Sequence, residues 1–152
     1  MDNSYKPNWR YRTYQDFCTY LPSWLWQWMV TLTFPQPHLK AQAVNSLRLN
    51  WTRKLCTSEK IQVAYFYVLA YDSGHPHLHL LMIGKGQNGN KSLLDVDLNK
   101  WESAWPYISK IQVPSENLSV SGYLARHWLK YDPDRLEYDF YNKKLLKREK
   151  IN

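Results

Sequence analysis

The sequence contains little cysteine and no long apolar run. Its two cysteines, Cys18 and Cys56, lie far apart and form no CxxC pair, which argues against a disulfide framework or a cysteine zinc site. The longest apolar run, residues 63–71, is too short to span a bilayer. The first twelve residues are polar and basic, unlike a signal peptide. We therefore expect a soluble protein of the reducing cell interior.

Positive charge and aromatic side chains are abundant instead. The 152 residues carry a formal net charge of +7 and include 8 Trp and 12 Tyr. A chain of this length is most simply one domain with a real core. The charge favours a polyanionic partner such as nucleic acid or a membrane surface, and the aromatics can fill a core or stack on unpaired bases.

The hydrophobic pattern predicts a strand-helix order typical of an α+β fold. Residues 14–27 suggest a short helix interrupted near Pro22, after an exposed arm. The elements expected after it are strand 28–34, helix 38–55, strand 61–71, a histidine strand ending near 83, helix 93–105, strand 109–113 and helix 117–130. We expect residues 57–60 to form a turn and 84–91 a polar loop. Antiparallel strands with intervening helices indicate helices packed on a single sheet.

The most informative stretch is GHPHLHLLM, residues 74–82, which holds three of the five histidines. On a strand, His77 and His79 point the same way, about 7 Å apart, whereas Leu78 and Leu80 point into a core. Two imidazoles side by side make half of a metal site. The simpler alternative is a strand that happens to be rich in histidine.

A second group of polar side chains falls on the helix expected at 117–130. Its members recur at i, i+3, i+4 and i+7 and so share one face: Tyr123, Arg126, His127 and Lys130. This set suits phosphodiester chemistry, in which a tyrosine attacks phosphorus and cations stabilise the developing charge. The alternative is the exposed mixed face of an amphipathic helix.

Three stretches in this order resemble the HUH endonucleases: VTLTF at 30–34, PHLHLL at 76–81 and YLARHWLK at 123–130. More narrowly, the chain looks like a single-tyrosine rolling-circle replication initiator (Rep) of a small plasmid or virus. The resemblance covers residues 28–131, which we take as the endonuclease core. Residues 1–27 would then be an arm with a short helix, and 132–152 a basic, partly helical tail.

The resemblance implies a ferredoxin-like (RRM-like) antiparallel sheet of about five strands, with the histidine strand central. It implies Mg²⁺ or Mn²⁺ held by His77 and His79. By the same resemblance Tyr123 is the nucleophile that forms a 5′-phosphotyrosine, with Arg126 and Lys130 where relatives carry lysines. The second tyrosine position of relatives is His127 here, which implies a single-tyrosine mechanism.

Two positions depart from the family pattern. Many relatives place a metal-binding glutamate near the position of Ala70, which cannot coordinate an ion. Asp72 is the nearest carboxylate and our substitute, although it could simply make the hairpin turn. Arg126 keeps the charge of a lysine but cannot exchange a proton, so Lys130 carries more of the phosphate and proton handling.

The partners expected from the resemblance are single-stranded or origin DNA, a separate helicase because no helicase motor follows, and a host polymerase, with no membrane. Further DNA contacts are expected from His75 and His127 and from the tail cations Lys143, Lys144, Lys147 and Arg148, unless the tail is simply a solvated terminus. One alternative is a transposase or relaxase with the same chemistry. Another is a non-catalytic module in which the histidines hold structural zinc, although no second ligand pair lies at zinc-finger spacing.

Overall fold

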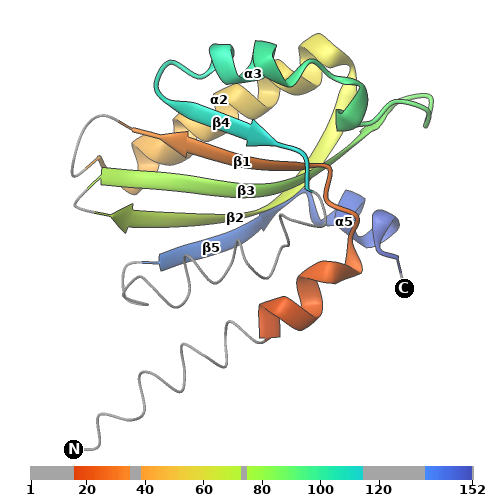
Figure 1. Ribbon diagram of the computed structural model, residues 1–152, viewed down its shortest axis with the longest axis horizontal. Coiled ribbons are helices and arrows are strands. Elements are labelled where there is room, and N and C mark those ends of the chain that lie inside the picture. Colours follow the sequence, from red (N-terminus) through yellow and green to blue (C-terminus); the bar gives the residue numbers. More distant parts are fainter. Residues whose placement is uncertain (1–15, 35–38, 73–74, 115–135, 152) are drawn as a thin grey trace, which may run out of the picture.

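Five antiparallel strands form one open sheet in the order β4-β1-β3-β2-β5 (Figure 1). The computed structural model describes residues 16–34, 39–72, 75–114 and 136–151. The strands are β1 (Trp28–Thr33), β2 (Ile61–Asp72), β3 (His75–Gly86), β4 (Ser109–Gln112) and β5 (Leu136–Tyr141). The helical elements are η1 (Leu21–Ser23), α2 (Ala41–Glu59), η2 (Leu93–Asp95), α3 (Leu98–Ala104) and α5 (Lys143–Glu149).

The connections follow the order β1-α2-β2-β3-α3-β4, with β3 in the middle of the sheet. β1 and β2 both pair with β3 in antiparallel register, and β4 pairs with the far edge of β1. This is a ferredoxin-like arrangement to which β5 adds an edge strand beside β2. The expected fold class, an antiparallel sheet of about five strands carrying helices, is therefore confirmed, with the histidine strand central.

The two faces of the sheet bury separate apolar clusters. α2 and α3 cover the first face, where Leu78, Leu80 and Met82 of β3 are fully buried. On the second face, Leu81 and Ile83 pack with the segment around η1 and with α5. The alternation along β3 thus places its even-numbered side chains in the first core, as the sequence predicts.

Helix α2 is longer than its hydrophobic period predicts. It runs on to Glu59, through the residues expected to form a turn, and ends where Lys60 adopts a left-handed conformation (φ 55°, ψ 47°). A helical arginine is usually exposed, but only 6% of Arg48 is exposed. It lies one turn before Thr52 on the buried side of α2.

Three other segments differ from the sequence-based expectation. β3 extends to Gly86, into the expected loop. The helix expected at 93–105 is two pieces, η2 and α3, because Asp97 starts a new helix by accepting a hydrogen bond from the Asn99 N–H. The basic tail contains an edge strand, β5, before α5, and the prediction of a partly helical tail missed that strand.

The described part of the chain contains no helix with the length and apolar character needed to cross a membrane.

Candidate functional site

His77 and His79 lie next to each other on one face of β3. Their ring centroids are 6.4 Å apart and the ring planes differ by 13°. Odd-numbered side chains of β3 point to the second face of the sheet, away from α2 and α3. His77 is half-buried, and His79 is 8% exposed. The interpretation of this stretch as two imidazoles sharing one face of a strand agrees with the structure.

The neighbouring strands supply small or hydroxyl-bearing side chains around the pair. On β1, Thr33 pairs with His77 and Thr31 with His79. On β2, Ala70 lies opposite His77 and Val68 opposite His79.

The two threonines make different contacts. The Thr31 Oγ1 atom is 3.4 Å from His79 Nδ1, so it can accept or donate according to the imidazole tautomer. The Thr33 hydroxyl instead donates to the carbonyl of Ile108 at 2.7 Å, and the indole of Trp105 donates to the Thr33 carbonyl at 2.9 Å. The end of β1 beside the histidines is thereby fixed to the segment that leads into β4.

The two imidazoles can supply two of the ligands that one divalent cation needs. A metal-nitrogen bond to histidine is about 2.0–2.1 Å long, so two nitrogens sharing an ion lie at most about 4 Å apart. The ring centroids are 6.4 Å apart, so the two rings would have to turn toward each other to share an ion. Imidazole nitrogens suit zinc better than they suit Mn²⁺. A carboxylate oxygen as a further ligand would favour the harder ions.

A third ligand of the His, Cys, Asp or Glu type does not come from the described side chains. Among them, no group of three or more His, Cys, Asp or Glu residues is placed to hold an ion. The register puts Ala70 directly opposite His77, at the position where a carboxylate was expected. Asp72 pairs through its backbone with His75, and its side chain lies outside the described part of the structure.

The predicted tyrosine helix also lies outside the described residues. Four site residues belong to it: Tyr123, Arg126, His127 and Lys130. Their roles stay predictions. His75 is described and half-buried at the start of β3, two residues before His77 on the same face.

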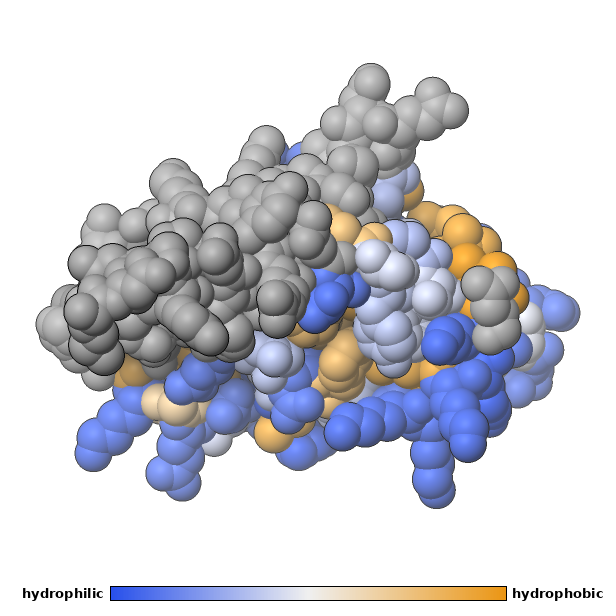
Figure 2. Space-filling view, turned by 90° about the horizontal axis from the view of Figure 1, so that it is seen from below, coloured by the Kyte–Doolittle hydropathy of each residue, from blue (hydrophilic) through white to orange (hydrophobic). Residues whose placement is uncertain are grey.

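The predicted tail cations lie at the opposite end of this face. The exposed residues of α5 are Lys143, Lys144, Lys147 and Arg148, and Lys150 directly after the helix is exposed as well. α5 is held there because Leu145 and Leu146 are buried and the Trp24 indole donates to the Leu146 carbonyl at 2.8 Å. Figure 2 shows hydrophilic side chains along the lower edge of this view, on its left as well as on its right. At about 3.4 Å per residue, six positions along β3 separate His77 from Ile83, so roughly 20 Å separates the two regions.

A titratable group with a strongly raised pKa lies on the other face of the sheet. Burial raises the pKa of Tyr65 to about 12, although the nearby Arg48 guanidinium acts to lower it. The Tyr65 hydroxyl is 2.8 Å from both Arg48 Nη1 and Thr52 Oγ1. The Arg48 guanidinium also lies 4.2 Å from the ring centroid of Tyr67, whose pKa is likewise raised by burial. These groups join α2 to β2 and are separated from the histidines by the sheet.

Sequence reasoning missed Thr31, Thr33 and the Arg48 network. The alternation in VTLTF shows that two threonines share a face, but only the pairing of β1 with β3 places them beside the histidines. Comparisons of the chain with protein-family models, with curated proteins and with solved structures give no match.

Proposed function

We propose that the chain is a metal-dependent, site-specific single-strand DNA endonuclease that nicks and rejoins DNA to initiate rolling-circle replication. The observation that carries the proposal is the pair His77 and His79, side by side on the central strand of a ferredoxin-like sheet. The face of the sheet that carries these histidines is opposite the face that α2 and α3 cover. The resemblance of residues 28–131 to HUH endonucleases supplies the chemistry.

In this proposal the hydroxyl oxygen of Tyr123 attacks the scissile phosphorus and loses its proton. The bond from phosphorus to the 3′-oxygen breaks, which leaves a 5′-phosphotyrosine and a 3′-hydroxyl that takes up a proton. Rejoining is the same exchange in reverse, so neither water nor a redox partner is consumed. Arg126 and Lys130 would stabilise charge on the phosphate, and Lys130 can also move a proton.

His77 and His79 would hold Mg²⁺ or Mn²⁺ in this reaction. The ion supplies Lewis-acid polarisation of the phosphate oxygens. Thr31 would orient the His79 ring through the contact at Nδ1, because the hydrogen bond at one ring nitrogen decides which nitrogen is open to a ligand. The protein would work in the cytoplasm of a host cell on plasmid or viral DNA, together with a separate helicase and the host polymerase.

The decisive test is a covalent adduct on single-stranded DNA. The protein is incubated with Mn²⁺ and a pool of single-stranded oligonucleotides labelled at either end, then denatured. The 3′-terminal label should migrate with the protein, and the 5′-labelled fragment should be extendable by a polymerase. Tyr123→Phe should abolish the adduct; an adduct that persists in this variant contradicts the nucleophile assignment.

Two other outcomes separate the alternatives. A transposase or relaxase would form the same adduct and the same 3′-hydroxyl, but would not start repeated copying of a circular template together with a helicase and a polymerase. Tight DNA binding without cleavage under any metal would favour a non-catalytic zinc module built on the histidines.

The third ligand has its own test. Asp72→Ala should raise the Mn²⁺ concentration needed for half-maximal nicking by about tenfold if its carboxylate binds the ion. Glu137→Gln is a matched control, because Glu137 is an exposed carboxylate paired with Leu69, on the opposite face. Equal metal dependence in both variants would remove Asp72 from the site.

A further inference from the structure

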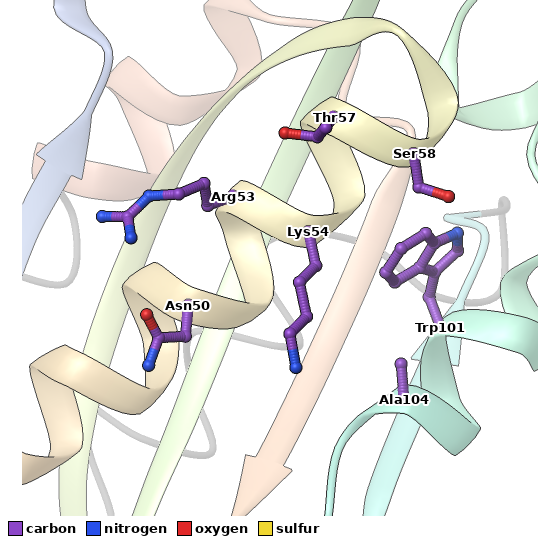
Figure 3. A pocket seen from close by; sticks show the side chains of 7 residues that line it. All are labelled: Asn50, Arg53, Lys54, Thr57, Ser58, Trp101 and Ala104. Atoms are coloured by element: carbon purple, nitrogen blue, oxygen red, sulfur yellow. The ribbon is translucent and has the colours of Figure 1, made fainter.

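A groove with basic and hydroxyl side chains runs between α2 and α3, on the face of the sheet opposite His77 and His79. Its volume is about 620 Å³. Figure 3 shows its lining: Asn50, Arg53, Lys54, Thr57 and Ser58 from α2, and Trp101 and Ala104 from α3. None of these side chains carries a carboxylate.

The donors on α2 form one row along the groove. Asn50, Arg53, Lys54, Thr57 and Ser58 recur at i, i+3, i+4, i+7 and i+8, which is one side of a helix. At a rise of about 1.5 Å per residue the row is about 12 Å long, close to three or four base-pair steps of about 3.4 Å. All five side chains can donate hydrogen bonds, as a row of phosphate oxygens requires.

Two cations of the row have no ion-pair partner within the described part of the chain. Arg53 and Lys54 are exposed and make no ion pair or side-chain hydrogen bond there. The nearby carboxylate of Glu59 is shared between Lys91 and Lys100, each at 4.0 Å, so it does not neutralise them. Lys100 adds a third positive charge beside the groove, with its Nζ atom 3.4 Å from the Ser58 hydroxyl.

The floor of the groove favours contact with a phosphate backbone over stacking of an unpaired base. Trp101 is 3% exposed, so its ring face is not open to an unpaired base. Its indole N–H has no acceptor among the described residues, and Figure 3 shows the nitrogen on the side of Ser58. Proteins that hold single strands without sequence preference combine cations with exposed aromatic platforms, and this groove has the cations alone.

From this row, we propose that the α2–α3 groove binds the phosphate backbone of duplex DNA. The site is separate from the proposed nicking site, because the sheet lies between them. It would let the protein hold a duplex on one face while a single strand reaches the histidines on the other. The groove contact does not depend on cleavage, so the two proposals can fail independently.

The test compares two double variants that lose the same charge. Arg53→Gln with Lys54→Gln removes the groove cations from exposed helix positions. Lys40→Gln with Lys60→Asn is the matched control, since Lys40 caps α2 without a side-chain bond and the left-handed Lys60 tolerates asparagine. Thermal melts by circular dichroism check that both variants fold.

Binding is measured by fluorescence anisotropy with a 20-base-pair duplex of mixed sequence at several salt concentrations. The groove variant should bind about tenfold more weakly near 0.1 M salt, and the slope of log Kd against log salt should fall by about 1.8, or about 0.9 per lost phosphate contact. The control should change the duplex affinity by less than about twofold. The groove variant should nick short single strands at the unaltered rate.

Three results would overturn the proposal. Equal losses in the two double variants would mean general electrostatic attraction rather than a site. An equal loss for a single strand of the same length would remove the preference for duplex. Unchanged duplex affinity would remove DNA from the groove and leave an acidic protein segment as the occupant to examine next.

Discussion

The two faces of β3 carry alternate residues of one strand and differ in chemical character. On the first face Leu78, Leu80 and Met82 are fully buried under α2 and α3. On the second face the same stretch presents His77 and His79, beside the hydroxyl of Thr31. One face is a continuous apolar core, and the other carries polar groups whose burial costs free energy unless they are hydrogen-bonded.

The second face is itself divided along the strand. Toward its far end Leu81 and Ile83 are covered by the segment around η1 and by α5. Between His75 and Ile83 the polar positions of this face lie only at the end where β3 begins, and Lys85, beyond Ile83, pairs with Glu149 of α5. A core could use valine at every one of these positions, and this is the packing argument behind the role proposed for the imidazoles.

The largest expected effect comes from removing an imidazole on the polar face. If the proposed site is correct, His77→Ala should reduce nicking about 10³-fold, or about 4 kcal/mol of transition-state stabilisation, because the proposed metal ion would lose a ligand. His77 is half-buried, so the variant should keep its fold and its DNA affinity. The measurement is single-turnover nicking with Mn²⁺, alongside anisotropy.

The control for this variant is His75→Ala, on the same face two residues earlier, which should cost less than about tenfold in nicking if His75 only contacts substrate. If His77→Ala loses DNA affinity as much as nicking, the histidines are structural and the contrast between the faces disappears.

The next effect is on the apolar face. Leu80→Ala should lower the free energy of unfolding by about 2–5 kcal/mol, because a fully buried side chain leaves a cavity. Urea denaturation measures it, with Leu25→Ala as control because Leu25 is 76% exposed. Nicking should fall only in proportion to the unfolded fraction and recover on cooling. A loss below about 1 kcal/mol would show that this face is loosely packed.

Sequence patterns predicted the faces of β3 because alternation is local. They could not place Thr31 beside His79, since that contact depends on which strands pair. β5 was missed because its residues, LEYDFY, alternate charged and aromatic side chains at a sheet edge, without an apolar run. The burial of Arg48 was missed because a helical arginine is usually exposed, whereas here the Tyr65 hydroxyl and the Tyr67 ring across the interface hold the guanidinium.

A smaller effect is expected from the polar network under α2. Tyr65→Phe removes the hydroxyl bonded to Arg48 and Thr52 and should lower the free energy of unfolding by about 1–2 kcal/mol. Tyr107→Phe is the control, because Tyr107 is 37% exposed and lies outside this network. Nicking should be unchanged, since the sheet separates Tyr65 from the histidines. Reduced nicking at full stability would mean that the two faces are coupled.

The same tyrosine predicts a pH dependence of stability. Its pKa is about 12 in the folded protein and about 10 in an unfolded chain. Deprotonation therefore favours unfolding, so the stability that this group contributes is complete below pH 10 and declines as the pH rises toward 12. The difference in unfolding free energy between the native protein and Tyr65→Phe should shrink over that interval, by on the order of 2 kcal/mol. A constant difference would show that the phenol is not buried as described.

The smallest effect tests whether the polar face is organised beyond its two imidazoles. Thr31→Val keeps the shape and the β-branching of the side chain but removes the oxygen 3.4 Å from His79 Nδ1. That contact is long for a hydrogen bond, so the loss should be near the low end of about 0.5–1.5 kcal/mol, which is about a two- to threefold rise in the Mn²⁺ needed for half-maximal nicking. The rate at saturating metal should not change, because the substitution alters the orientation of a ligand and not the number of ligands. Thr33→Val is the sharper companion: its hydroxyl bonds the Ile108 carbonyl instead of an imidazole, so it should lower stability without changing the metal requirement. If the two valine variants behave alike, the threonines only fill space beside the histidines, and the polar face is no more than a pair of imidazoles on a strand.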